Sequence, residues 1–174
     1  MDVFEAIARR YSYRGAFTEA AVTRDDLRRI VQAGIQAPSA RNEQVAQFVI
    51  VDDVEVLSKL AELLDRPVCQ TAKAMIVCVT DNRPVFEGIA FPLEDCAASV
   101  ENMLLAVTTL GYATVWLDGV LRRGDVAEQI GQLLGVPEEL TVRILLPLGV
   151  PLAPGKQREK LPFEKRAWFN RYGG

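Results

Sequence analysis

One long helical stretch constrains the fold of this chain more than any other feature. The segment "PLEDCAASVENMLLAVTTLG", residues 92–111, starts with a proline suited to a first helical turn and ends with a glycine typical of a helix stop. One side carries apolar residues at helical spacing, namely Ala97, Val100, Met103, Leu104, Val107 and Leu110. Ala98, Leu105 and Ala106 add apolar surface elsewhere. Such a helix is expected to be buried on more than one face, either centrally or against a partner subunit.

Shorter elements on both sides of this helix predict an α+β fold. Helices are expected to begin after Asp2, Thr23 and Asp53, each of which can cap a first turn. Pro38 should end the helix that follows Thr23, and a further helix is expected over 126–134, before Gly135. The apolar runs 48–51, 75–79, 114–117 and 141–150 predict strands. Because the order shows no regular βαβ repeat, a mixed or α+β sheet is favoured.

Bulk properties narrow the class of protein. The chain has 174 residues, 49% hydrophobic content and a net charge of −3, which suits one globular domain and gives no reason to expect a nucleic acid as partner. The longest apolar runs are too short to cross a bilayer, and the N-terminus lacks a secretory signal. We therefore expect a cytoplasmic protein without a membrane partner.

Two features of composition limit the chemistry. The chain has no histidine, which excludes Ser-His-Asp and Cys-His catalysis and histidine-ligated metal sites. Cys69, Cys78 and Cys96 lack C-x-x-C spacing and are interpreted as buried thiols. No side chain is assigned as a catalytic residue or a metal ligand. An enzyme of this composition should take its chemistry from a cofactor.

The C-terminal end differs from the rest. Residues 147–162 contain four prolines, which disfavour the middle of a sheet. Five large apolar residues then follow or lie among them, namely Leu161, Phe163, Trp168, Phe169 and Tyr172. This apolar content is high for a solvated tail, so we expect the segment to lie across a surface, such as that of another subunit.

Basic residues near both chain ends suggest an anion site. "RRYSYR" places Arg10, Ser12 and Arg14 at alternate positions, and "GKQREK" does the same with Lys156, Arg158 and Lys160. Guanidinium groups flanking a hydroxyl can hold a phosphate or the polar edge of a heterocycle. Neither a Walker loop nor a G-x-G-x-x-G sequence after a strand is present. Each basic run alone is more typical of solvated surface.

Together with a third stretch these runs resemble a known family. "RRYSYR" resembles the Arg-x-Ser-x-Arg opening of the FMN-dependent nitroreductases, and "APSARNEQ" is similar to their Ala-Pro-Ser-x-x-Asn-x-Gln stretch. "DCAASVENMLLAVTTLGYATVWL" resembles their long central helix and next strand, and "GKQREKLPFEK" the C-terminus of short members. The likeness covers most of the chain.

The resemblance implies a fold and an assembly. Residues 1–174 would form a single nitroreductase-like domain with a central mixed or antiparallel sheet flanked by helices. The protein would be a homodimer with FMN at the interface, and residues from about 147 to 174 would form an extended arm exchanged across the dimer and wrapping the partner subunit.

The resemblance also implies a set of flavin-binding residues. One group would contact the phosphate, ribityl chain and pyrimidine edge and comprises Arg10, Tyr11, Ser12, Arg14, Lys156 and Arg158. A second group would reach the flavin from the other subunit and comprises Pro38, Ser39 and Asn42. The turn near flavin N5 would comprise Trp116, Leu117, Asp118 and Gly119.

The implied reaction is ping-pong hydride transfer. NADH or NADPH would reduce the flavin at N5, and a small oxidised acceptor such as a nitroaromatic or a quinone would reoxidise it. Positive groups near the pyrimidine edge would stabilise the reduced flavin. The chain departs from the family pattern at Glu43, Val45 and Ala46. By the same resemblance, segment 81–91 would form a shortened version of the family's active-site cover. These departures bear on substrate preference.

Other functions stay open at the level of sequence. The departures are also compatible with a non-redox flavin-binding or storage module. A related flavin enzyme that cleaves the flavin ring or removes halogen reductively is a further alternative. The plainest alternative is an α+β dimer whose Arg and Lys residues are merely solvated.

Overall fold

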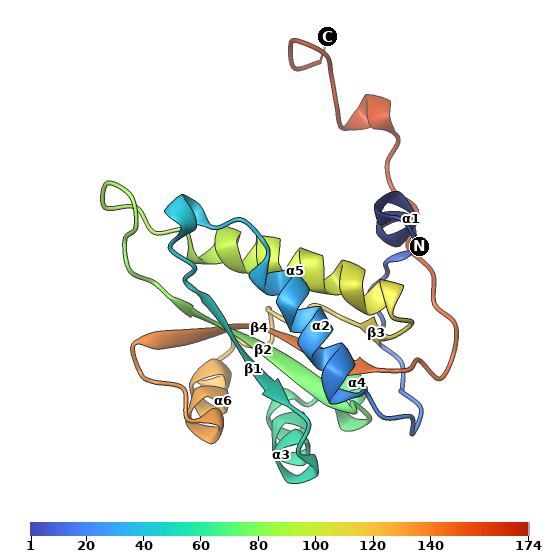
Figure 1. Cartoon of the computed structure of the whole chain (residues 1–174), viewed down its shortest axis with the longest axis vertical. Coiled ribbons are helices and arrows are strands. Elements are labelled where there is room, and N and C mark those ends of the chain that lie inside the picture. Colours follow the sequence, from blue (N-terminus) through green and yellow to red (C-terminus); the bar gives the residue numbers. More distant parts are fainter. Residues whose placement is uncertain (174) are drawn as a thin grey trace.

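A four-stranded antiparallel sheet separates two layers of helices in the computed structural model, which describes residues 1–173 (Figure 1). The strands are β1 (Ala46–Val51), β2 (Ala74–Asp81), β3 (Ala113–Thr114) and β4 (Leu140–Gly149). Their spatial order is β1-β2-β4-β3, and every neighbouring pair is antiparallel. The predicted α+β class with a central antiparallel sheet is confirmed.

Helices cover both faces of this sheet. They are α1 (Val3–Arg9), α2 (Arg24–Ile35), α3 (Val54–Leu64), α4 (Pro67–Gln70), α5 (Pro92–Thr109) and α6 (Val126–Leu134). Two short 3₁₀ turns are η1 (Ala40–Asn42) and η2 (Phe163–Lys165). Helices α2 and α5 lie on one face, and α3 and α6 lie on the other (Figure 1). The pattern did not predict α4, η1 or η2, each of which is too short for helical periodicity to show.

Strand β2 divides the interior into two hydrophobic cores. Ile76 and Cys78 belong to the core under α2 and α5, whereas Val77 and Val79 belong to the core over α3 and α6. Side chains alternate between the faces of a strand, so a strand covered on both faces needs an unbroken apolar sequence. This requirement explains why "MIVCV" shows no alternation of apolar and polar residues.

Helix α5 occupies the centre of its layer. Its buried apolar side includes Val100, Met103 and Val107, as predicted. Helix α2 approaches closely because Gly34 has no side chain: a Cβ there would lie 2.9 Å from Met103 Cγ. Ala98 and Leu105 are only half-buried, so α5 keeps apolar surface that this chain does not cover.

Strand β3 is shorter than the predicted strand 114–117, and Pro147 accounts for the difference. Leu145 and Leu117 exchange backbone hydrogen bonds of 2.9 and 3.0 Å, so Leu145 directs its N–H toward the β3 side. Backbone direction alternates along a strand, and Pro147 therefore faces the same side without an N–H to donate. The pairing breaks opposite this residue. Pro147 itself lies inside β4, in agreement with the predicted strand 141–150.

The predicted helix caps are present. The side chain of Asp2 accepts a 2.8 Å hydrogen bond from the Glu5 amide, and Thr23 accepts one of 3.1 Å from Asp26. Asp53 accepts two hydrogen bonds in the same way. These caps satisfy amides that the first helical turn leaves without a partner.

All three cysteines are free and buried, as the sequence indicated. Burial raises the pKa of the Cys69 thiol to about 12, so it stays protonated at neutral pH. The sulfur atoms of Cys78 and Cys96 lie 3.2 Å apart between β2 and α5.

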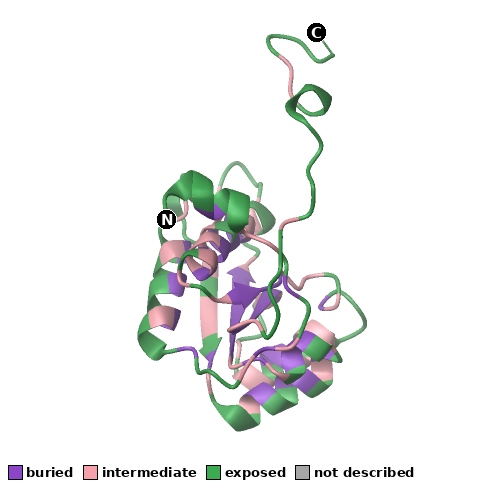
Figure 2. Ribbon diagram, turned by 90° about the vertical axis from the view of Figure 1, so that its right-hand side faces the viewer, coloured by how far each residue is buried: buried purple, intermediate pink, exposed green. Residues whose placement is uncertain are grey.

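The last part of the chain extends away from the body (Figures 1 and 2). The arm expected from about residue 147 begins inside β4, which ends at Gly149; residues 159–173, called the arm from here on, are almost entirely exposed. Their aromatic rings contact one another in pairs: Phe163 with Phe169 and Trp168 with Tyr172. Phe169 is 80% exposed and Tyr172 is 90% exposed, so this chain alone offers the arm no surface. Among residues 1–173, no helix is long and apolar enough to span a membrane.

We predict that Ile30→Ala lowers the free energy of unfolding by about 2–5 kcal/mol, because Ile30 of α2 is fully buried in the core that α2 and α5 share. Chemical denaturation measures this loss. Gln32→Ala, on the exposed side of the same helix, should change stability by less than about 0.5 kcal/mol. Equal effects of the two substitutions would contradict the described packing.

We predict that Tyr112→Phe raises the pKa of Asp26, because the Tyr112 hydroxyl donates a 2.9 Å hydrogen bond to this carboxylate and holds its pKa below the ordinary value. A lowered folded-state pKa stabilises the fold above pH of about 4 and loses that effect as the pH falls. The variant should therefore lose less stability on acidification. NMR titration of the Asp26 carboxyl checks the shift, and an unchanged pKa would refute it.

Candidate functional site

The first basic stretch runs along the short strand β3. The Tyr13 amide donates a 2.8 Å hydrogen bond to the Thr114 carbonyl, and Ser12 pairs with Thr114 in a parallel bridge. Tyr13 is buried, whereas Ser12 and Arg14 on either side of it are exposed. The alternation expected of an extended segment therefore turns Ser12 and Arg14 toward solvent.

The second basic stretch lies beside the first. The Gln157 side-chain amide donates to the carbonyls of Ile7 and Arg10 at 3.0 and 2.9 Å. Gly155 lies so close to the Tyr11 ring that a Cβ would overlap it. Burial under this segment raises the pKa of the Tyr11 phenol. The two ends of the chain, far apart in sequence, thus form one surface.

The turn after β3 borders the same surface. Leu117 is held by its two backbone hydrogen bonds to Leu145, and Trp116 packs beside the core under α5. The Asp118 carboxylate accepts hydrogen bonds of 2.8 and 2.6 Å from Arg122 and so is neutralised locally. Gly119 is exposed. The turn therefore offers backbone groups and a partly buried indole rather than a free charge.

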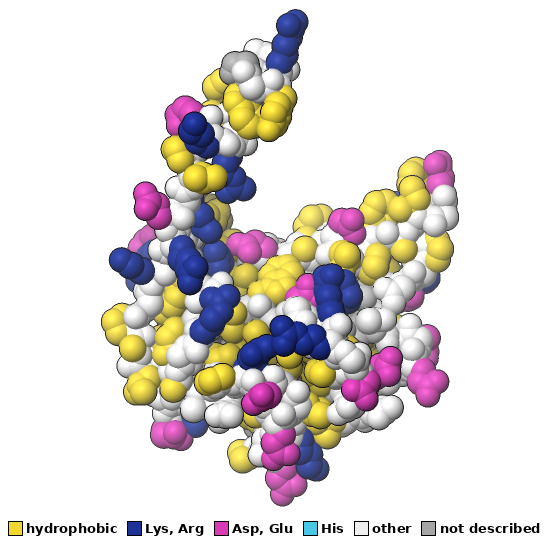
Figure 3. Space-filling model, turned by 180° about the vertical axis from the view of Figure 1, so that it is seen from behind, with side chains coloured by type: hydrophobic (Ala, Val, Ile, Leu, Met, Phe, Trp, Pro, Cys, Tyr) yellow, Lys and Arg dark blue, Asp and Glu magenta, His cyan; other side chains and the backbone are white. Residues whose placement is uncertain are grey.

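The surface is rich in cations without carboxylate partners. None of the ion pairs formed within residues 1–173 involves Arg14, Lys156 or Arg158, and Arg10 makes only a long contact of 3.8 Å to Glu101. Figure 3 shows Lys and Arg side chains along the arm and over the adjoining face. Arg and Lys in such a setting suit a phosphate monoester. The residues present therefore fit the phosphate end of FMN.

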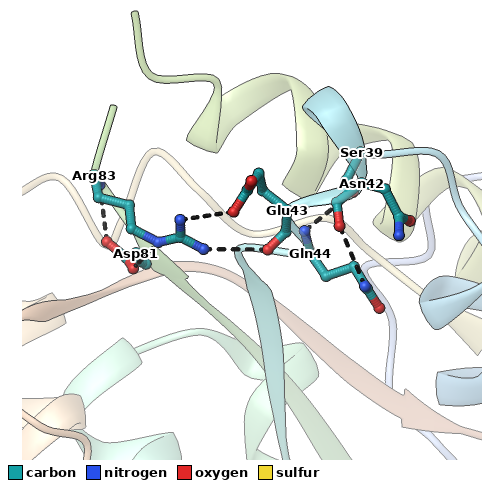
Figure 4. Close-up of polar contacts among 6 residues, drawn as sticks. All are labelled: Ser39, Asn42, Glu43, Gln44, Asp81 and Arg83. Atoms are coloured by element: carbon teal, nitrogen blue, oxygen red, sulfur yellow. Dashed lines mark hydrogen bonds and ion pairs between the residues drawn. The ribbon is translucent and has the colours of Figure 1, made fainter. Parts of the chain in front are cut away.

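The third stretch forms a strained loop elsewhere in the fold. Arg41, Asn42 and Gln44 have φ angles of 51°, 59° and 51°, in the left-handed region that costs a residue with a side chain about 1–3 kcal/mol. The loop holds itself together: Ser39 Oγ accepts a 3.1 Å hydrogen bond from the Gln44 amide, and Gln44 Nε2 donates to the Asn42 carbonyl at 3.2 Å (Figure 4). Such strain persists only where surrounding contacts enforce it.

Glu43 points out of this loop toward an arginine. Arg83 donates 2.9 and 3.3 Å hydrogen bonds to the Glu43 carboxylate and carbonyl, and a further 2.8 Å bond to Asp81 at the end of β2 (Figure 4). The sequence suggested that Glu43 adds a negative charge to the motif. The structure pairs that charge with Arg83, and so ties the loop to the segment after β2.

A cavity of about 560 Å³ opens beside the loop. Pro38 and Ser39 line one side, and Phe86 and Phe91 line another. The guanidinium of Arg41 lies 5.5 Å from the centre of the Phe86 ring, a cation–π distance. The short segment 81–91 thus covers the loop through its aromatic residues.

The loop and the basic surface do not meet within one chain. Arg10 contacts α5 at Glu101, whereas the loop contacts α5 at Asp95, through a 2.9 Å hydrogen bond from the Ala40 amide. Six residues along a helix correspond to a rotation of about 240°, so these contacts lie on different sides of α5. None of the hydrogen bonds or ion pairs within residues 1–173 joins the two regions.

Three residues with a structural part in these regions were missed from the sequence. Gln157 fastens the two basic stretches together, Arg83 pairs with Glu43, and Asp95 bonds to the loop. Asp95 stands beside Glu94 in the first turn of α5, where acidic residues are common, so its position in the sequence does not mark it as a loop contact. Nothing in the sequence indicates which carbonyls Gln157 reaches.

Comparison with known proteins identifies the family of this chain. The model of the nitroreductase family matches residues 7–74 and 75–150. A protein from Archaeoglobus fulgidus, described as a candidate NADH dehydrogenase/NAD(P)H nitroreductase, is 35% identical over 136 residues, which cover 78% of each chain.

Solved structures show the same fold. The NADPH:FMN oxidoreductase from Vibrio harveyi, complexed with NAD⁺, superposes with a TM-score of 0.84 at 26% identity, over 98% of this chain and 77% of that one. A structure from Bacteroides thetaiotaomicron, described in the same words as the archaeal relative, reaches 0.85 at 25% identity over 98% of each chain. The chain therefore belongs to the nitroreductase family.

Proposed function

We propose that this protein is an NAD(P)H-dependent FMN oxidoreductase that works as a homodimer. In this proposal the basic surface of one subunit and the strained loop of its partner form each flavin site. The family assignment and the NADPH-flavin oxidoreductase of Vibrio harveyi, 28% identical over 168 residues, support a flavin-dependent reaction. The observation that carries the proposal is the separation of the two regions on different sides of α5.

Two-fold pairing of α5 accounts for that separation. If two copies of α5 pack antiparallel, the N-terminal half of one helix lies beside the C-terminal half of the other. The loop next to Asp95 of one subunit then approaches the basic surface of its partner. The half-buried Ala98 and Leu105 supply apolar surface for such packing. The site is incomplete in one chain, which makes dimerisation a condition for binding.

Each region has a role that follows from its chemistry. Arg14, Lys156 and Arg158, which form no ion pair within residues 1–173, bind the phosphate, and Arg10 with Ser12 offers donors along the polar chain and pyrimidine edge. Tyr11 supports the segment that carries Lys156.

The remaining site residues shape the ring pocket. The turn from Trp116 to Gly119 presents backbone groups at the reactive edge. Pro38, Ser39 and Asn42 of the strained loop close the pocket from the other subunit. Bound FMN supplies hydride transfer at N5, from NADH or NADPH to a small oxidised acceptor in ping-pong order. The cations near the pyrimidine edge stabilise negative charge there, and no protein acid is needed.

The arm has an assembly role in this proposal. The arm exposes the apolar rings of Phe163, Phe169 and Tyr172, and α1 exposes Phe4 to 79%. Apolar surfaces of this kind mark protein–protein contacts. The arm of each subunit therefore wraps the partner, with residues 1–174 forming one domain.

A visible absorption spectrum tests the function directly. Purified protein, supplied with FMN, should show the bands of bound flavin, and NADH or NADPH should bleach them anaerobically. A nitroaromatic or quinone should restore them. Protein that cannot take up FMN would contradict the proposal, and bound flavin that neither nicotinamide reduces would favour a storage role instead.

We predict that Arg14→Ala and Arg158→Ala each raise the FMN dissociation constant by about 10- to 100-fold, because each removes a charge-assisted contact to phosphate. Fluorescence titration measures this change. Riboflavin, which lacks the phosphate, should bind the variants and the native protein alike.

Arg28→Ala is the matched control. Arg28 lies on α2, with its side chain 81% exposed and a long contact of 3.7 Å to Asp25, away from the basic surface. Its removal should leave FMN affinity unchanged. If all three substitutions act equally, net charge rather than a phosphate site sets the affinity.

We predict that the double substitution Phe163→Ser and Phe169→Ser weakens the dimer by at least about tenfold, because it removes apolar area that the partner would bury. Sedimentation at several concentrations measures dissociation. Val54→Ser, on α3 with Val54 79% exposed, is the control. If the arm variant and the control have the same dimer dissociation constant, the arm does not contact the partner and the prediction is wrong.

A further inference from the structure

Asp95 lies in the first turn of α5 and, unlike its acidic neighbour Glu94, is buried. It is 4% exposed, in a helix whose other buried residues are mostly apolar. One carboxylate oxygen, Oδ1, accepts the 2.9 Å hydrogen bond from the Ala40 amide. The other oxygen, Oδ2, is buried and has no hydrogen-bond partner within residues 1–173. A buried carboxylate with an open oxygen is costly, so packing alone does not explain it.

The bond to Ala40 replaces a missing helix cap. Ala40 starts the 3₁₀ turn η1, and the preceding Ser39 makes no capping bond to that turn. Ser39 Oγ instead accepts from the Gln44 amide, which closes the strained loop. The Ala40 amide would otherwise lack a partner, because the first amides of a helical turn have none within it. Asp95 therefore caps η1 from a neighbouring helix.

A second polar residue of α5 acts on the same side. Asn102 Nδ2 donates a 3.1 Å hydrogen bond to the Ala33 carbonyl near the end of α2. Asp95 and Asn102 are seven residues apart, or about two helical turns, and so lie on one side of α5. One bond holds the chain before Pro38 and the other holds it after Ser39. The helix thus fixes both ends of the turn that leads into the strained loop.

We propose that Asp95 is a positioning residue for FMN binding: it holds the strained loop in the shape that presents Pro38, Ser39 and Asn42 to the partner's flavin. This inference rests on the proposed function. The left-handed residues Arg41 and Asn42 follow Ala40 directly, so a fixed Ala40 amide restrains the costly part of the loop. Asp95 contacts the loop backbone and acts through it.

Asp95→Ala should loosen the loop in flavin-free protein. Hydrogen exchange of amides 40–44 should become at least about tenfold faster, since one hydrogen bond contributes roughly 1.4 kcal/mol to a closed state. Asp95→Asn keeps an acceptor oxygen and should exchange like the native protein. Glu94→Ala, one residue away and exposed, is the control. Slow exchange in Asp95→Ala overturns the inference whether or not flavin binds.

Flavin titration provides the second measurement. Asp95→Ala should raise the FMN dissociation constant roughly tenfold, and Asp95→Asn should restore it. If the native protein binds no FMN, the proposed function is contradicted, and the hydrogen-exchange experiment alone decides whether Asp95 holds the loop. Native protein that binds FMN, with Asp95→Ala unchanged or Asp95→Asn equally weak, overturns the inference and leaves the function standing.

Ala40→Pro tests the same bond from the loop side, in case Asp95→Ala folds poorly. Proline removes the amide hydrogen, its fixed φ suits the first position of a helical turn, and Ser39 already has the extended backbone that a following proline requires. If the bond to Asp95 sets the loop, Ala40→Pro should weaken FMN binding, and adding Asp95→Ala should weaken it no further. An additive loss in the double variant would contradict a shared interaction.

Discussion

The packing of α5 against α2 and the sheet is the interaction on which the site depends. Met103 fills the space that Gly34 leaves open, and this contact fixes the spacing of the two helices. Two residues of α5 contact the candidate site from that position. Asp95 bonds to the strained loop, and Glu101 contacts Arg10 of the N-terminal basic stretch. A rigid central helix thus sets the positions of two regions that do not touch each other.

Unpaired positive charge and backbone strain are found outside the hydrophobic cores, in the basic surface and in the strained loop. Within residues 1–173 the basic surface keeps Arg14, Lys156 and Arg158 without carboxylate partners, although the chain as a whole has a net charge of −3. The loop contains three residues in the strained left-handed conformation. Neither feature stabilises a single chain. In the proposed function, both serve to complete a site with a partner subunit and a phosphorylated ligand.

The sequence predicted most of the secondary structure because local chemistry determines it. Capping by Asp2 and Thr23 and the apolar periodicity of α5 each indicated the right element. The length of β3 could not be predicted, because it depends on the distant Pro147 lying opposite it in the sheet. The pairing of Glu43 with Arg83 is likewise a contact across 40 residues of sequence. The family motifs supplied the candidate site residues, and the fold brought two of the three stretches together.

Subunit mixing tests most directly whether each flavin site is shared between two chains. One parent chain carries Arg14→Ala with Arg158→Ala, and the other carries Ser39→Trp, which blocks the loop side. Each parent dimer should bind FMN weakly at both sites. Mixed dimers contain one site with an intact basic surface and an intact loop, so they should recover tight binding of one FMN per dimer. Mixed dimers that bind no more tightly than the parents would contradict a shared site.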